Sequence, residues 1–185
     1  PVVIQGSYGW KLSNVALLLV PGDSAAVVVG ALSGKIAAHL SSRRAIVIAM
    51  TMIAVALAIP AFLIGGWVGT FAISMVLFGS GFALMYAPLL STAIRDVPRA
   101  KSGIAIGFYN LIINMAVPIG IAFAATLRNL GLSLTSFAGQ SPKEASYGSV
   151  LLILAIITVL ALLLYRIFIR MLEREDDANA AMMGA

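Results

Sequence analysis

The sequence predicts an all-α membrane protein, a polytopic bundle of about five transmembrane helices. Of the 185 residues, 61% are hydrophobic and 10% are charged, and the mean hydropathy is +1.04. A soluble domain has about 45–50% apolar and about 25% charged residues, so these values exclude a soluble globular fold. The apolar residues form long continuous runs and not alternating ten-residue segments, which indicates helices and argues against a barrel.

Five of these runs are long enough to cross a bilayer, whose core of about 30 Å requires about 20 helical residues. Each is rich in Leu, Ile, Val, Ala and Met, and in chain order they cover residues 15–40, 45–64, 68–94, 104–127 and 147–169. Residues 129–146, between the last two runs, are the one long irregular loop. The other connections are short, so any function must reside in the helices and their short loops.

The two ends of the chain have a different character. Residues 1–13 are expected to be the end of a preceding helix and an outer turn, and residues 14–172 the five-helix bundle. Residues 173–185, which are charged and then Ala-rich, are expected to form a disordered cytoplasmic tail. Because the chain begins at Pro1 and lacks the charged start and cleavage site of a signal peptide, we expect it to be a piece of a longer protein.

The basic residues flank the apolar runs and separate into two groups when the runs cross a membrane in order. On one side are Lys11, Arg128 and Lys143. On the other side are Lys35, Arg43, Arg44, Arg95, Arg99, Lys101, Arg166, Arg170 and Arg174. Positive residues favour the cytoplasmic side, so the second group and the C-terminus are expected there. Topology thus accounts for the net charge of +5, and no nucleic-acid partner is expected, because no basic patch is interleaved with aromatic residues.

The sequence contains no motif or residue cluster typical of an enzyme, a metal site or a cofactor site. It contains no Cys, which excludes disulfides and thiolate ligands, and no Gly-x-Gly-x-x-Gly, Walker, His-Glu-x-x-His or Gly-x-Ser-x-Gly motif. The single histidine, His39, has no second His or neighbouring carboxylate in sequence. We therefore expect no enzyme activity, no cofactor and no metal.

Asp23 is the one acidic residue inside an apolar run. A charge at mid-bilayer costs about 2.5–3.5 kcal/mol, so such a residue normally faces a cavity or a partner. One interpretation is a hydrated carboxylate near the outer interface that bonds to Ser24 or to a backbone group left unpaired by Pro21. The other is a site for a cationic substrate or a coupling proton. Pro21 and Gly22 precede it, so the helix is expected to be kinked or broken there.

Two carboxamides, Asn110 and Asn114, lie one turn apart in the fourth run, with Tyr109 beside them and Pro118 one turn further on. They either bind a ligand in a wet cavity or hold two helices together. Small residues recur at four-residue spacing and predict helix-packing faces. These faces are Gly30 with Gly34, Gly79 with Ala83, and Gly103 with Gly107.

Several segments follow one another in an order that resembles a known family. They are Pro1-Val-Val-Ile-Gln5 with Gly6, Leu18-Leu-Val-Pro-Gly22, the Gly-rich segment 78–88 that ends in Pro88, Gly107-Phe-Tyr-Asn110, and Pro118-Ile-Gly120. This order resembles the C-terminal half of the major facilitator superfamily, specifically the fourteen-helix drug:proton antiporters such as the tetracycline and quaternary-ammonium exporters. The resemblance extends from the start of the chain to about Met171.

A degenerate copy of that family's cytoplasmic loop motif follows the first run. It comprises Gly34, Lys35, His39, Arg43 and Arg44. The segment departs from the family pattern at Ala38, where the family has Asp, and at Ser41, where it has Gly. The charge latch attributed to that loop is therefore not implied here.

The resemblance implies part of a secondary active transporter in a bacterial inner (plasma) membrane. It implies proton-coupled efflux of amphipathic or cationic small molecules, and hence a role in multidrug or antibiotic resistance. The partners implied are the lipid bilayer, the substrate, protons and a missing N-terminal half of the same protein. The alternatives are a non-transporting scaffold or truncated module, or a major facilitator transporter for another solute.

Overall fold

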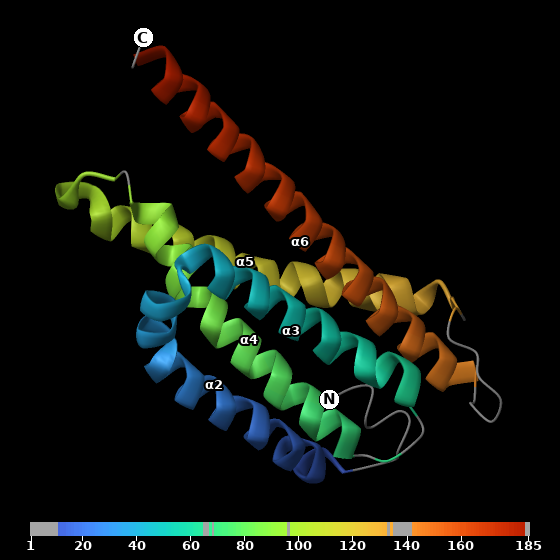
Figure 1. The fold of residues 1–185 in the computed structure, drawn as a ribbon. Helices are drawn as coiled ribbons and strands as arrows, with labels where there is room; N and C mark the ends of the chain where they lie inside the picture. The colour runs from blue at the N-terminus through green and yellow to red at the C-terminus, as the bar shows by residue number, and fades with distance from the viewer. Residues whose placement is uncertain are drawn as a thin grey trace.

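The computed structural model describes residues 11–64, 67, 69–95, 97–132, 134 and 142–183 (Figure 1). This part of the chain contains α2 (Leu12–Leu40), α3 (Ser42–Leu63), α4 (Gly69–Ile94), the 3-10 helix η1 (Arg99–Lys101), α5 (Ser102–Asn129) and α6 (Pro142–Met183). Each of the five α-helices includes a segment long and apolar enough to cross a membrane. The predicted all-helical bundle with five spans is confirmed.

Each of the first four α-helices contains a proline and continues through it. The prolines are Pro21, Pro60, Pro88 and Pro118. A proline frees one carbonyl of the preceding turn, and in membrane helices neighbouring helices or local adjustment of the backbone compensate for that loss. Of the kink or break expected at Pro21 and Gly22, the break is absent, since α2 runs without interruption from Leu12 to Leu40.

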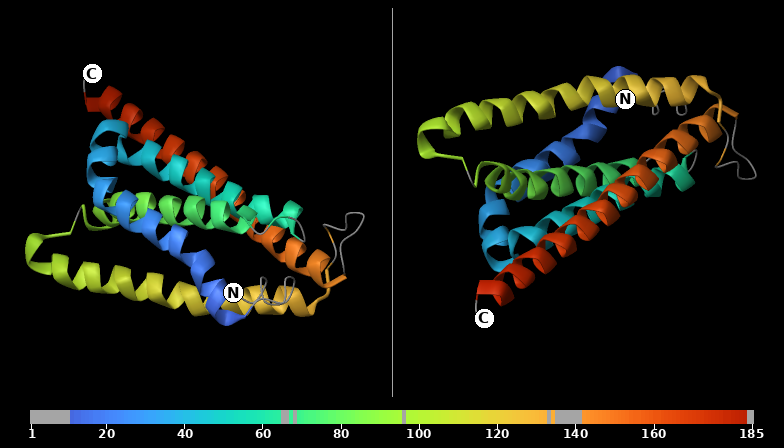
Figure 2. Two further views of the ribbon diagram at one scale, coloured as in Figure 1. Left: turned by 90° about the horizontal axis from the view of Figure 1, so that it is seen from below. Right: turned by 90° about the horizontal axis from the view of Figure 1, so that it is seen from above.

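The helix α4 lies at the centre of the packing. It packs extensively against α2 and against α3, and α3 also packs against α6 (Figure 1). The helix α5 makes much smaller contacts, with α4 and α6, and lies apart from the main layer along most of its length (Figure 2). The bundle is thus a row of closely packed helices with α5 loosely attached.

Glycines allow α2 and α4 to approach closely. A Cβ atom added at Gly22 would lie 2.8 Å from the carbonyl oxygen of Met75, and one added at Gly79 would overlap the carbonyl oxygen of Gly22. Further along the same contact, a Cβ at Gly30 would meet the Cβ of Ala83 at 3.8 Å. The predicted packing faces at Gly30 and at Gly79 are therefore in use.

Three other glycines of the predicted packing faces have no such neighbour. No described atom lies within 4 Å of a Cβ added at Gly34, Gly103 or Gly107. The prediction of a packing face at these positions is not met within the described chain. For Gly103 and Gly107 the reason is that α5 turns most of its surface away from the other helices.

Buried apolar side chains form two small clusters and not one large core. One contains Val15, Ile64 and Phe71, and the other contains Ala45, Ala49 and Leu84. Most large apolar side chains remain exposed, and no described residue of α5 is buried. This is expected where lipid tails are as apolar as the side chains and do not drive them inward.

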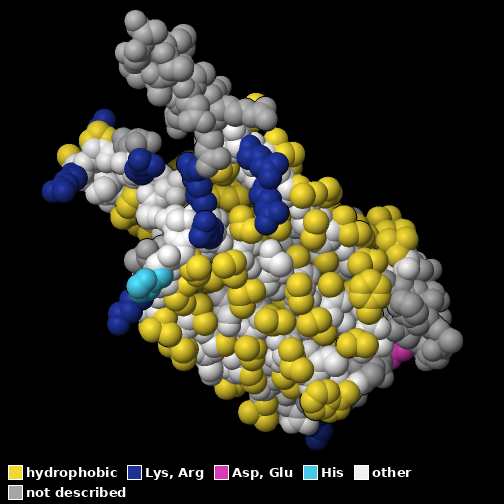
Figure 3. All heavy atoms as spheres, viewed as in Figure 1, with side chains coloured by type: hydrophobic (Ala, Val, Ile, Leu, Met, Phe, Trp, Pro, Cys, Tyr) yellow, Lys and Arg dark blue, Asp and Glu magenta, His cyan; other side chains and the backbone are white. Residues whose placement is uncertain are grey.

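Charge and apolar surface are separated along the bundle. Hydrophobic side chains cover the face shown in Figure 3, and Lys and Arg side chains gather toward one end of it. This is the end with the α2–α3 junction, the α4–α5 connection and the C-terminal part of α6 (Figure 1). The two groups of basic residues inferred from the sequence therefore lie at opposite ends of the bundle.

The end segments differ in part from the expectations. Residues 1–10, the greater part of the expected preceding helix and turn, lie outside the described residues, and α2 already begins at Leu12. The tail expected to be disordered from residue 173 continues as helix α6 up to Met183. Its composition explains the difference, because Leu, Glu, Arg, Ala and Met are strong helix formers.

Candidate functional site

A hydrogen bond between two side chains links α4 to α5. The hydroxyl of Tyr86 on α4 donates a hydrogen bond to Oδ1 of Asn110 on α5, with an O···O distance of 2.7 Å. Both side chains are half-buried. A phenol hydroxyl in an apolar environment needs such a partner, and here the partner comes from the neighbouring helix.

Tyr109 lies beside this hydrogen bond. Its ring contacts the ring of Tyr86 edge to face, with centroids 5.8 Å apart and an interplanar angle of 69°. Its hydroxyl oxygen is buried and has no hydrogen-bond partner among the described residues. A buried hydroxyl without a partner carries the cost of its lost hydrogen bonds to water.

The two tyrosines line a groove of about 320 Å³ between α4 and α5. Its other lining residues are apolar: Phe82, Met85, Leu89, Ile113, Ala116 and Val117. Ligand pockets typically have volumes of about 300–1,000 Å³ and a few polar groups in a mostly apolar wall. The groove therefore has the size and composition to hold a small amphipathic molecule.

Asn114, the second predicted carboxamide, does not reach another helix. Its Nδ2 donates a hydrogen bond to the backbone oxygen of Asn110 at 2.8 Å, and the residue is exposed. Of the two asparagines, Asn110 therefore bonds across the helices and Asn114 bonds within α5. Both remain on the face of α5 that carries the contact to Tyr86.

Asp23 is not part of this cluster. It is exposed on α2 and makes no hydrogen bond or ion pair within the described residues. The helices α2 and α5 make no contact with each other in the described structure, although both pack on α4. The neighbouring Gly22 packs against Gly79, and Tyr86 lies seven residues beyond Gly79, which is about 10 Å along the helix.

The predicted cytoplasmic loop motif is almost entirely helical. Gly34, Lys35 and His39 lie on the last turns of α2, and Arg43 and Arg44 lie on the first turn of α3. A single residue, Ser41, separates the two helices, and it has φ 63° and ψ 146°. Among the described residues, no group of three His, Cys, Asp or Glu side chains could hold a metal ion.

Tyr86 is the residue of this cluster that the sequence interpretation missed. It lies in the Gly-rich segment 78–88, which was considered for its glycines and Pro88 alone. The signal that could have found it is its hydroxyl, since a phenol placed inside an apolar run requires a partner on another helix. The identity of that partner depends on how α4 and α5 are rotated against each other.

Comparison with known proteins gives one match. A family model described as Major Facilitator Superfamily matches residues 1–121, which include α2, α3, α4 and the greater part of α5. No curated protein and no solved structure matches the chain.

Proposed function

Because the chain belongs to the major facilitator superfamily, a family of membrane transporters of solutes, we propose that it forms part of a proton-coupled exporter of amphipathic or cationic small molecules. The observation that carries the proposal is the groove between α4 and α5, which Tyr109 lines together with Tyr86, the residue that bonds Asn110. Apolar walls suit the hydrocarbon part of such a molecule, and the tyrosine rings suit its positive charge.

The exposed surface of α5 is an argument for a second helical domain that packs against this one in the transporter. No described residue of this helix is buried, and the groove opens beside it. In alternating access, two bodies rock against each other around a central site. We propose that the N-terminal half of the same protein supplies the second wall of the cavity and covers α5.

The distribution of charge supports one orientation. Most of the described basic residues gather at the end of the bundle with the α2–α3 junction, and positive residues favour the cytoplasmic side. We propose that this end and the C-terminus face the cytoplasm of a bacterial cell, with the protein in its inner membrane. Export then moves the substrate from this end to the opposite one.

Asp23 is proposed as the residue that senses a proton or a cation. It is exposed on α2, and its neighbour Gly22 packs against Gly79, which is about 10 Å along α4 from Tyr86. A charge in an apolar medium acts beyond direct contact, because electrostatic forces are strong there.

The test compares Asp23→Asn with the unaltered full-length protein in proteoliposomes that carry a proton gradient. The amide keeps the shape of the side chain and removes its charge. We expect transport of the cation ethidium to fall about tenfold, the equivalent of 1.4 kcal/mol, and transport of a neutral amphiphile of similar size to change less. If Asp23→Asn transports both compounds with the same kinetics as the unaltered protein, Asp23 has no role in the mechanism. The functional site is then sought around Asn110.

The same measurement separates the exporter from its alternatives. Ethidium flux that stops when an uncoupler removes the proton gradient supports proton-coupled export. Flux of ethidium that the uncoupler leaves unchanged contradicts proton coupling. A full-length protein that moves neither compound is a scaffold or a transporter for another solute.

A further inference from the structure

An apolar groove lies between α5 and α6, at the end of the bundle opposite the basic end. It has a volume of about 260 Å³ and is separate from the groove beside Tyr109, which lies between α4 and α5. Two of its lining residues, Arg128 and Tyr147, are polar, and both lie next to the α5–α6 connection. The others are Ile121, Ala124, Ala125, Val150, Leu151 and Leu154.

The two helices leave this space for two reasons. The contact between α5 and α6 is small, and the α5 wall contains the short side chains of Ala124 and Ala125. On α6, Leu154 lies seven residues beyond Tyr147, which is about 10 Å along the helix. The groove therefore extends from Tyr147 toward the middle of the apolar segment Glu144–Met171.

Arg128 is positioned at one end of the groove by the ring of Tyr147. The central carbon of its guanidinium lies 5.7 Å from the ring centroid, within the range of a cation–π contact. A guanidinium has five N–H donors, and those of Arg128 form no hydrogen bond or ion pair within the described residues. The side chain is therefore held in place while its donors can bind an anion.

Tyr147 is in turn fixed by the other helices. It packs against the buried cluster that contains Val15 of α2 and Phe71 of α4. The hydroxyl of Ser146, the residue before it, donates a hydrogen bond of 3.4 Å to the backbone oxygen of Arg128. These contacts join the end of α5 to the bundle and define where the guanidinium lies.

Aromatic residues indicate that this end of the bundle lies at the membrane surface. Trp67, between α3 and α4, is 74% exposed at the same end as Tyr147, and Trp and Tyr are enriched where a membrane meets water. Arg128 lies on the last turn of the α5 span, and a long basic side chain near the end of a span reaches the headgroups. The guanidinium is thus at the level of lipid headgroups, and the groove is at the level of acyl chains.

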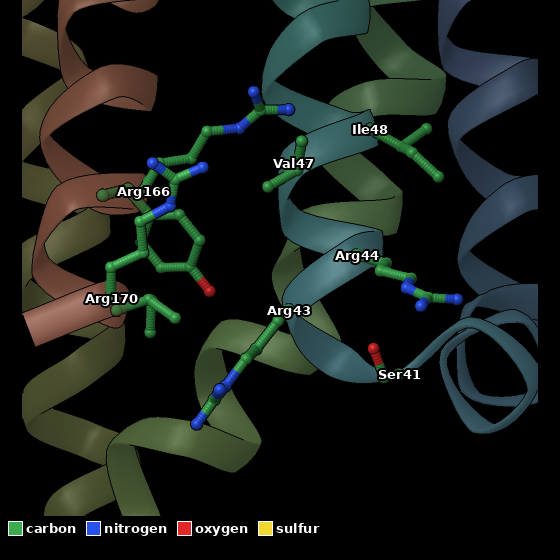
Figure 4. A pocket seen from close by; sticks show the side chains of 9 residues that line it. Ser41, Arg43, Arg44, Val47, Ile48, Arg166 and Arg170 are labelled. Carbon is green, nitrogen blue, oxygen red and sulfur yellow. The ribbon is translucent and has the colours of Figure 1, made fainter. Parts of the chain in front are cut away.

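The basic residues at the opposite end of the bundle are arranged differently. A larger hollow of about 880 Å³ is lined there by Arg43 and Arg44 of α3 and by Arg166 and Arg170 of α6. Figure 4 shows Arg44 pointing away from α6, so these four charges do not converge on one point. The α5–α6 groove differs because a single arginine is fixed at the end of an apolar cavity.

We propose that the α5–α6 groove binds one anionic phospholipid, with its phosphate on Arg128 and an acyl chain between Ala124 and Leu154. A guanidinium donates two parallel hydrogen bonds to one phosphate group, and the apolar walls suit an acyl chain. Glu144, the described carboxylate nearest in sequence, lies one turn before Tyr147 and does not line the groove. The lipid and the transported substrate occupy different pairs of helices, so this proposal does not depend on the proposed function.

Native mass spectrometry of the full-length protein in mild detergent tests the proposal, with phosphatidylglycerol, phosphatidylcholine and inorganic phosphate as probes. We expect phosphatidylglycerol to be retained about fivefold more strongly than phosphatidylcholine. This ratio corresponds to the attraction of about 1 kcal/mol between an anionic lipid surface and one basic residue. Arg128→Gln should remove the preference and leave the binding of phosphatidylcholine unchanged.

Lys11→Gln is the matched control for charge. Lys11 is exposed at the start of α2, at the same end of the bundle, and does not line the groove. The control also removes one positive charge, so it should keep the preference for phosphatidylglycerol. An equal loss in Arg128→Gln and Lys11→Gln would mean that total charge and not the groove attracts the lipid, and would overturn the proposal.

A second pair of variants tests the position of the acyl chain. Ala124→Leu fills the groove and leaves Arg128 in place, so it should lower the retention of phosphatidylglycerol. Ala122→Leu adds the same volume at an exposed position of α5 that does not line the groove, so its retention should match that of the unaltered protein. Equal retention in the two variants would place the acyl chain elsewhere and contradict the proposal.

Two further outcomes decide between a lipid and a free anion. Displacement of phosphatidylglycerol by millimolar inorganic phosphate would identify a site for a soluble anion and contradict a lipid site. The absence of any preference in the unaltered protein would contradict the proposal without reference to a variant. If Arg128→Gln does not fold, as judged by its elution as a single species, Arg128→Lys replaces it. Lysine keeps the charge but cannot donate the two parallel hydrogen bonds, so the preference should fall.

Discussion

Tyr86 and Tyr109 are neighbours with opposite hydrogen-bonding states. The hydroxyl of Tyr86 donates to Asn110 across two helices, and the hydroxyl of Tyr109 has no described partner. Hydrogen bonds between membrane helices contribute about 0.6 kcal/mol on average and at most about 1.7 kcal/mol. The two phenols therefore contribute differently to stability and to binding, although they lie on the same groove.

A pair of Tyr to Phe substitutions tests this difference. Tyr86→Phe removes the bond to Asn110, so we expect the free energy of unfolding to fall by about 0.6 kcal/mol. Tyr109→Phe removes a hydroxyl that bonds no described group, so we expect stability to stay equal or to rise. Thermal unfolding in detergent measures the first effect, and transport measures whether the second hydroxyl binds substrate. A Tyr109→Phe variant less stable than Tyr86→Phe would contradict the described hydrogen bonding.

Ser41 has a backbone conformation that L-amino acids rarely adopt, with φ 63°. A residue held in this region costs about 1–3 kcal/mol. Glycine adopts it freely, although a glycine loses more conformational freedom on folding. The backbone of Ser41 therefore has a conformation that suits glycine better than serine.

We expect Ser41→Gly to stabilise the protein by about 1 kcal/mol, since the relief of strain exceeds the added entropic cost. Thermal unfolding of the full-length protein measures the change. Ser42→Gly is the matched control, because Ser42 is the first residue of α3 and gains nothing from glycine. Equal effects of the two variants would show that the backbone of Ser41 is not strained.

At the scale of elements, the glycines of α4 and α5 have different roles. Gly79 lies against the backbone of Gly22 on α2, and no described atom lies within 4 Å of a Cβ at Gly107 on α5. Replacement of glycine by alanine therefore has different consequences on the two helices. On α4 it separates a packed pair, and on α5 it adds a methyl group to open space.

We expect Gly79→Ala to destabilise the protein by about 1–3 kcal/mol, the usual cost of overpacking. Gly107→Ala should be neutral or stabilise it by up to about 1 kcal/mol, since Ala favours a helix more than Gly does. Unfolding measured on both variants gives the comparison. If Gly107→Ala destabilises the full-length protein as strongly as Gly79→Ala does, another part of the protein packs closely against Gly107.

At the scale of the whole molecule, the basic residues predict the orientation of the bundle in the membrane. The α2–α3 junction and the α4–α5 connection lie at one end, and the α5–α6 connection lies at the other (Figure 1). The chain contains no Cys, so single cysteines can be introduced without a background. The position of each end relative to the membrane is therefore directly measurable.

We expect Gly139→Cys, in the loop between α5 and α6, to react with an impermeant thiol reagent in intact cells. Ser42→Cys, at the start of α3, should react after the cells are opened and not before, because we propose that the basic end faces the cytoplasm. Gly139 lies outside the described residues, and the prediction for it rests on the sequence. Labelling of Ser42→Cys alone in intact cells would reverse the topology.

The sequence alone determined the fold class, the position of the five spans and the separation of the basic residues. Hydropathy and charge act on each residue through its transfer between water and lipid, so they can be read along the chain without knowledge of neighbours. The apolar run expected at 45–64 corresponds to α3, Ser42–Leu63, for this reason. The sequence predicted that Asn110 either binds a ligand or holds two helices together, and the structure bonds it to Tyr86 of another helix.

The tertiary structure decided which side chains meet. It paired Tyr86 with Asn110, packed Gly22 against Gly79, separated Asp23 from the asparagines, and joined arginines more than a hundred residues apart. In lipid, both the inward and the outward face of a helix are apolar, so periodicity does not show how the helix is rotated. The rotation follows from the fit of small side chains between helices, and it becomes known when the helices are packed together.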